Sequence, residues 1–170
     1  MDWPALLIPA VFLYRVFGSR VPYAGVPLKI KVLHALALLF LFFCFFDVPN
    51  SVFWLIGSPS QVFGAQYVAV GIFPPICSLL IFCCNVAAGI FTLICGFAMA
   101  WGDDRARKRF VSWFPATVTV IGFDMLKAAE KSDTSLFGIV FGFVFVALLL
   151  LLVYRFYTGA QSEFLFPAPQ

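Results

Sequence analysis

The stretch QYVAVGIFPPICSLLIFCCNVAAGIFTLICGFAMAW, residues 66–101, decides the fold class because its thirty-six residues carry no formal charge. A single straight helix of that length would extend about 54 Å at about 1.5 Å per residue, whereas the hydrocarbon core of a bilayer is about 30 Å thick. Proline is tolerated in the first turn of a helix and disfavoured in its interior, so Pro74 and Pro75 divide the stretch. The sequence therefore predicts a membrane-spanning helix over residues 74–101.

One face of this predicted helix is small and polar, with positions that recur every seven residues or fall close to them on a helical wheel. Its members are Ser78, Asn85, Gly89, Thr92 and Gly96. Small residues let membrane helices approach closely, and amides and hydroxyls form hydrogen bonds between them. We expect this face to pack inside a helix bundle, with Gly138 and Gly142 as further packing positions on a later helix.

The composition extends this expectation to the whole chain. Of its 170 residues 63% are hydrophobic and only 11% are charged, which is typical of polytopic α-helical membrane proteins. The predicted fold class is an all-α integral membrane protein, a bundle of four transmembrane helices with an N-terminal interfacial helix in a single membrane domain, residues 1–170. The elements are an interfacial helix over about 3–17, spans over about 27–48, 74–101, 110–129 and 134–157, and a short tail over 158–170.

Two segments outside the predicted spans have expectations of their own. Residues 57–64, GSPSQVFG, contain a proline and two glycines, which favours a loop held against the headgroups. The tail is too short to fold alone, and we expect Phe164, Leu165 and Phe166 to dock on a neighbouring element.

The distribution of lysine and arginine predicts the orientation. With four spans, nine of the eleven basic residues fall on one side, and only Lys127 and Lys131 fall on the other. The positive-inside rule then places both termini on the cytoplasmic side, or on the matrix side of a mitochondrial inner membrane. The mitochondrial inner membrane is favoured over a bacterial inner membrane.

The single histidine, His34, limits the cofactor chemistry. One histidine cannot supply two axial haem ligands, and no Cys, His, Asp or Glu residues have the spacing of a zinc or iron site. The sequence therefore predicts a structural role for His34, no cofactor, no metal and no catalytic residue. The alternative is a ligand shared with another chain.

A basic cluster follows the central helix and contains Arg105, Arg107, Lys108 and Arg109. These side chains would contact the headgroup of an anionic phospholipid such as cardiolipin. Positive-inside sorting alone would also produce such a cluster, and nucleic acid is not expected as a partner so close to a bilayer.

A polar route through the membrane is the alternative reading of four residues, Asp47, Asn85, Thr117 and Asp124. An acidic residue inside a bilayer is costly and often marks a path for protons or cations. The structural interpretation is that Asp47 begins a turn, Asp124 pairs with Lys127, and Asn85 forms hydrogen bonds between helices.

These observations favour a non-catalytic subunit of a larger membrane complex. The most plausible complex is an energy-transducing one such as a respiratory-chain complex, with this chain as an accessory subunit that contacts other membrane subunits. The alternative is a homo-oligomeric small channel, carrier or membrane sensor that uses the polar face of the central helix. An intramembrane enzyme is disfavoured because the expected acid–base or metal residues are missing.

Overall fold

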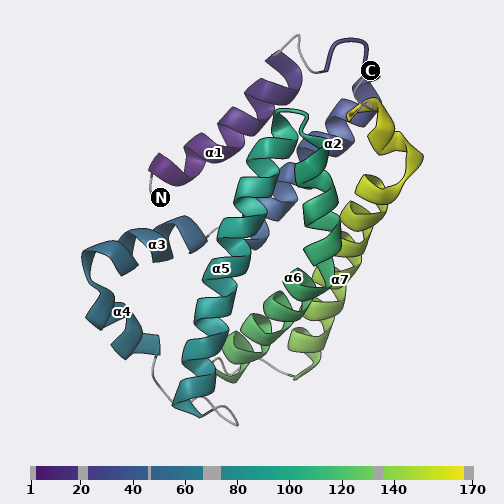
Figure 1. The fold of residues 1–170 in the computed structure, drawn as a ribbon. Helices are drawn as coiled ribbons and strands as arrows, with labels where there is room; N and C mark the ends of the chain where they lie inside the picture. Colours follow the sequence, from purple (N-terminus) through teal and green to yellow (C-terminus); the bar gives the residue numbers. More distant parts are fainter. Residues whose placement is uncertain (1–2, 19–22, 46, 67–73, 132–135, 167–170) are drawn as a thin grey trace. The chain divides into compact units, whose positions relative to one another are not determined.

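The computed structural model describes residues 3–18, 23–45, 47–66, 74–131 and 136–166, and every regular element in these ranges is helical (Figure 1). This agrees with the predicted all-α class. The α-helices are α1 (Trp3–Leu13), α2 (Leu28–Cys44), α3 (Asp47–Gly57), α4 (Pro59–Gln66), α5 (Pro75–Ala100), α6 (Asp104–Lys131) and α7 (Leu136–Thr158). A π-helical turn, η1 (Tyr14–Gly18), continues α1, and a 3₁₀ turn, η2 (Ala160–Phe164), follows α7.

Two of the described helices are long and apolar enough to cross a membrane. They are α5 and the Val140–Thr158 part of α7. The other two predicted spans fall short: α2 ends at Cys44 after 17 residues, and α6 carries a basic first turn, an internal Pro115 and charged residues after Phe123. Leu7–Gly18 forms a shorter apolar helix, and a helix of this length cannot span a bilayer.

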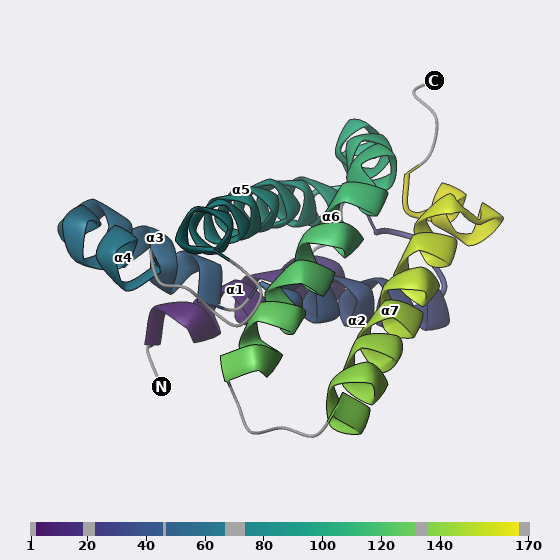
Figure 2. The same ribbon diagram turned by 90° about the horizontal axis from the view of Figure 1, so that it is seen from below.

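The prediction of a loop over residues 57–64 is wrong. Most of this segment lies in α4, and α3 ends at Gly57, shortly before α4 begins (Figure 2). Pro59 is the first residue of α4, where its missing N–H and fixed φ favour helix initiation. The turn-forming composition therefore marks the break between two short helices. α6 also begins earlier than predicted, at Asp104 and not at Phe110. The basic cluster of residues 105–109 is therefore helical.

The chain forms two compact units. Unit 1 contains Met1–Phe46, Phe91–Phe114 and Leu152–Gln170, and unit 2 contains Asp47–Ile90 and Pro115–Leu151. The core of unit 1 is aromatic and aliphatic, and its fully buried side chains include Phe12, Phe42, Phe110, Leu38 and Met99. Gly96 faces this core, where a methyl group would lie 3.6 Å from Phe12 and 3.8 Å from Leu38.

A tight turn in unit 1 joins α5 to α6. Gly102 has a φ of 80°, and its N–H donates to the carbonyl of Met99 while the N–H of Asp103 donates to that of Ala98. This pair of bonds is a Schellman motif, which ends a helix and favours glycine at the left-handed position. Asp103 then caps α6, because its carboxylate accepts a hydrogen bond from the N–H of Arg105 at 2.8 Å.

A glycine marks a close approach of two helices in unit 2. Gly122 of α6 faces the ring of Phe143 of α7, and a methyl group on Gly122 would lie only 2.9 Å from that ring. Beside this close approach lies an apolar groove of about 390 Å³, lined by residues that include Val118, Met125 and Val140.

Candidate functional site: a buried histidine between two tyrosines

His34 lies fully buried in unit 1 between two tyrosine hydroxyls. Its Nε2 atom is 3.0 Å from the hydroxyl of Tyr23, and its Nδ1 atom is 3.1 Å from that of Tyr157. Both tyrosines are fully buried as well. The three side chains come from the connector before α2, from α2 itself and from the last turn of α7.

The hydrogen-bond pattern determines the position of each proton. The hydroxyl of Tyr23 donates to the carbonyl oxygen of Met99 at 2.8 Å, and a carbonyl can only accept. Tyr23 must then accept from Nε2–H of His34, which leaves Nδ1 of His34 to accept from Tyr157. One chain of bonds therefore runs from Tyr157 through a neutral imidazole and Tyr23 to Met99.

The carbonyl of Met99 explains why Tyr23 belongs to this site. Met99 lies in the last turn of α5, where carbonyl groups lack partners within the helix. The Tyr23 hydroxyl provides a partner and so ties the proline-rich connector to the end of α5. Burial raises the pKa of Tyr23, and the nearby Arg15 acts in the opposite direction, so this hydroxyl keeps its proton at neutral pH.

Aromatic rings enclose the imidazole. Phe156 stacks on it with ring centroids 6.4 Å apart, and Phe166 meets it edge-on at 5.9 Å. Phe110 of α6 packs against Tyr157 at 5.9 Å. The tail thus contributes to the core: Leu165 and Phe166 are buried, whereas Phe164 is exposed.

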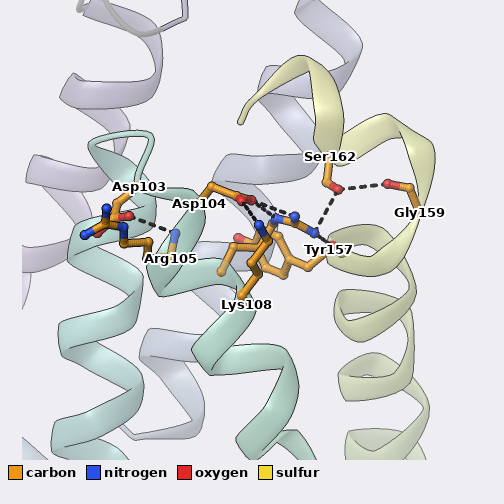
Figure 3. A network of polar contacts seen from close by, with 8 residues as sticks. Asp103, Asp104, Arg105, Lys108, Tyr157, Gly159 and Ser162 are labelled. Atoms are coloured by element: carbon orange, nitrogen blue, oxygen red, sulfur yellow. Dashed lines mark hydrogen bonds and ion pairs between the residues drawn. The ribbon is translucent and has the colours of Figure 1, made fainter. Parts of the chain in front are cut away.

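A polar network shares Tyr157 with this cluster, and Figure 3 shows it reaching from Asp104 and Lys108 to Tyr157 and Ser162. Nη1 of Arg107 donates to the backbone carbonyl of Tyr157 at 2.7 Å and lies 3.5 Å from the hydroxyl of Ser162. Nε and Nη2 both lie 2.6 Å from Oδ1 of Asp104. Arg107 therefore joins the start of α6 to the end of α7 and to η2. Its positive charge is also favourable at the C-terminal end of the α7 dipole.

Asp104 completes the network. Its Oδ2 atom lies 2.7 Å from Nζ of Lys108, so that the two carboxylate oxygens engage two cations. Burial alone raises the pKa of Asp104, but the hydrogen bonds from Lys108 and Arg107 outweigh it and lower the pKa below its ordinary value. The carboxylate is ionised at neutral pH and lies in the first turn of α6, where negative charge is favourable.

The arrangement supports a structural role for His34. Nδ1 accepts the Tyr157 hydrogen bond and Nε2 carries a proton, so neither nitrogen offers a lone pair to a metal. Within the described residues, no group of three His, Cys, Asp or Glu side chains is placed to hold a metal ion. A ligand role shared with another chain would require at least one of the two tyrosine contacts to break.

The predicted basic cluster divides into two pairs. Arg107 and Lys108 bind Asp104, and Arg107 is partly buried against Tyr157 and Ser162 of unit 1. Arg105 and Arg109 are exposed and form no ion pair with any described residue. The second pair therefore has charges that no described carboxylate engages, whereas Lys108 is exposed but paired with Asp104.

The polar face of α5 is largely buried. Ser78, Gly89, Thr92 and Gly96 are buried, and Asn85 is half-buried. The hydroxyl of Thr92 has no hydrogen-bond partner among the described atoms. Gly138 of α7 is exposed, and a methyl group on Gly142 would lie at an ordinary contact distance of 3.6 Å from Met125, whereas one on Gly122 of α6 would lie 2.9 Å from Phe143.

The predicted polar route is described only in part. Thr117 is buried and Asn85 is half-buried, whereas the side chains of Asp47 and Asp124 lie outside the described ones. The polar route stays a prediction.

The residues that complete the His34 cluster were not found from the sequence. Tyr23 lies in a segment rich in proline and glycine, and Tyr157 has the sequence position of an interface marker at the end of a span. Neither position has a local signal for pairing with a histidine 11 or 123 residues away. The only available signal was the single histidine within an apolar segment. Buried in a protein, both of its ring nitrogens need hydrogen-bond partners.

No protein-family model matches this chain, and the searches of curated proteins and solved structures gave no match either.

Proposed function

We propose that this chain is a non-catalytic membrane subunit that packs against other subunits of a larger assembly. The observation that carries the proposal is the His34 cluster, whose hydrogen-bonding groups bind one another inside an aromatic core. A cluster of this kind fixes the structure of unit 1 and presents no reactive atom to a substrate.

The exposed surface supports a role in assembly. Only 17% of the most apolar 18-residue stretch of α7 is buried, and only 28% of the corresponding stretch of α5. Phe137 and Phe141 of α7 are 80% and 64% exposed, with stacked rings 6.4 Å apart. Aromatic side chains of this size contribute strongly when they fill the grooves of a partner.

The full proposal includes four membrane spans, formed by α2, α5, α6 and α7, with α1 at the interface. α2 is apolar but short, and Lys29 and Lys31 at its start would snorkel to the headgroups. α6 is uncharged from Phe110 to Phe123, and the residues after Phe123 would reach the opposite interface. Both termini would then lie on the basic side, the matrix or cytoplasmic side.

The narrower form of the proposal is an accessory subunit of an energy-transducing complex, such as a respiratory-chain complex of the mitochondrial inner membrane. It rests on the small size of the chain and on helices that present both small-residue and aromatic faces.

The test is extraction from native membranes with a mild detergent, followed by size analysis and identification of co-purifying proteins. We expect the chain to migrate in a complex much larger than 18.9 kDa with defined membrane partners. A homogeneous, stable species that contains this chain alone would contradict the proposal. Co-migration with a respiratory-chain complex tests the narrower form separately.

A paired variant locates the docking face. Replacing Phe137 and Phe141 with alanine removes the exposed ring pair of α7 and should release partners while the chain remains inserted. The matched control replaces Leu28 and Leu36 of α2, which are 70% and 56% exposed, with alanine. Equal partner retention in both variants would exclude α7 as the docking face.

A further inference from the structure

An exposed face of α6 brings together two arginines and a tryptophan. Arg105, Arg109 and Trp113 are four residues apart and therefore lie one above the other on the helix surface. All three belong to unit 1 and are exposed, Trp113 to 59%. The helix places Trp113 about 6 Å along the axis from Arg109 at about 1.5 Å per residue.

Neither arginine of this face forms an ion pair within the described part of the chain. Asp104 binds Arg107 and Lys108, and the carboxylate of Asp103 accepts the backbone N–H of Arg105. Two cations at positions i and i+4 of a helix repel each other. An anion between the two guanidinium groups would remove this repulsion.

Trp113 lies between the cationic residues of this face and the uncharged part of α6. Its ring packs on Phe91 of α5 with centroids 5.8 Å apart, and beyond it α6 continues without charge as far as Phe123. Tryptophan is enriched at the level of the headgroups, next to the acyl chains. The sequence of groups along the face, cationic, then amphipathic, then apolar, matches that of a phospholipid from its headgroup to its tail.

The geometry points to a binding site for one anionic phospholipid, with its phosphate held by Arg105 and Arg109 and an acyl chain beside Trp113. Guanidinium groups bind phosphate oxygens in a bidentate fashion, and a second phosphate or a glycerol headgroup is accommodated because both arginines are exposed. The inference rests on the proposed membrane location of the chain, but it does not depend on a protein partner.

The experiment measures lipid binding to the purified full-length chain in detergent micelles by native mass spectrometry. Cardiolipin, phosphatidylglycerol and phosphatidylcholine are titrated separately. The test variant is Arg105→Ala with Arg109→Ala, and the matched control is Lys29→Ala with Arg155→Ala. The control removes two exposed positive charges elsewhere, and circular dichroism checks that both variants keep their helix content.

We expect the parent chain and the control to bind both anionic lipids more tightly than phosphatidylcholine. The double arginine variant should lose roughly fivefold in affinity for each arginine removed and bind anionic lipid about as weakly as phosphatidylcholine. Equal anionic-lipid affinity in the test and control variants would overturn the inference.

Two further measurements are made. Competition with phosphate distinguishes a lipid site from a site for a free anion, and fluorescence quenching locates the acyl chain. Inorganic phosphate at millimolar concentration should not displace bound lipid; complete displacement would show a site for a free anion and overturn the inference. Lipids with brominated acyl chains should quench part of the tryptophan fluorescence, and Trp113→Phe should remove that part. Unchanged quenching in Trp113→Phe would also overturn it.

Failure of this inference and failure of the proposed function are distinguishable. Loss of lipid selectivity without loss of co-purifying partners rejects the lipid site alone. A monomer without partners that still selects anionic lipid through Arg105 and Arg109 rejects the assembly proposal alone.

Discussion

The two compact units of this chain differ in how they enclose their large side chains. Among the largest fully buried side chains that the structure describes, all but Leu150 belong to unit 1. Unit 1 also holds the His34 cluster and the Arg107 network, whereas unit 2 contains an apolar groove of about 390 Å³ and the exposed pair Phe137 and Phe141.

This difference has a physical consequence. In unit 1, buried polar groups must meet specific partners, so they select one arrangement of the surrounding helices. In unit 2, the described contacts around Gly122 and Phe143 are apolar, and apolar contacts are less directional. Unit 1 should therefore be sensitive to single substitutions, and unit 2 should tolerate them.

The largest effect is expected from His34→Leu. The substitution leaves the buried Tyr157 hydroxyl without an acceptor and replaces a ring in a closely packed core, which should destabilise unit 1 by about 3 kcal/mol. Hydrogen–deuterium exchange of the protein in detergent should show faster exchange in α2 and the end of α7. Adding Tyr157→Phe should restore part of the protection, and unchanged exchange in His34→Leu would refute the proposed role of the cluster.

A smaller loss is expected from Arg107→Ala, which removes the contacts to Asp104, Tyr157 and Ser162. Charge-assisted hydrogen bonds of this kind contribute about 1.5–3 kcal/mol, so protection of the first turn of α6 and of η2 should fall. Arg105→Ala, in the same helix turn but exposed, should change stability by less than about 0.5 kcal/mol. Similar effects of the two substitutions would show that the network does not stabilise unit 1.

A matched pair of glycines tests the tolerance of unit 2. Gly122→Ala places a methyl group 2.9 Å from Phe143, but this ring is 39% exposed and borders the groove, so it can shift. We expect a cost below about 1 kcal/mol, whereas Gly142→Ala should be neutral or stabilising because its methyl group has ordinary contacts. Thermal unfolding monitored by circular dichroism would measure both, and a loss in Gly122→Ala as large as in His34→Leu would contradict the contrast between the units.

The smallest effect is a pH dependence of unit 1 through Asp104. The folded-state pKa of Asp104 is lower than its ordinary value, so its contribution is fully present above about pH 4 and is lost as the pH falls through the folded-state pKa. The melting temperature of the parent chain should therefore decline below about pH 4 by more than that of Asp104→Asn. Parallel pH profiles would exclude this contribution.

Much of the secondary structure could be predicted from the sequence because membrane-type helices have strong local signals. The Pro74–Pro75 pair and the uncharged run after it placed α5 within one residue of its observed ends, since proline acts on the backbone of its own turn. Residues 57–64 were predicted incorrectly because proline and glycine also occur at helix ends, and a local composition cannot distinguish a loop from a break between helices.

The sequence by itself determined the helical class, the apolar character of α5 and α7, and the presence of one histidine that would need partners if buried. Only the tertiary structure decided that Tyr23 and Tyr157 are those partners, and that Arg107 is partly buried in a polar network while Arg105 and Arg109 are exposed. The physical reason is the range of the interactions. Helix formation depends on neighbours within one or two turns, whereas each contact in the His34 cluster joins segments that only packing brings together.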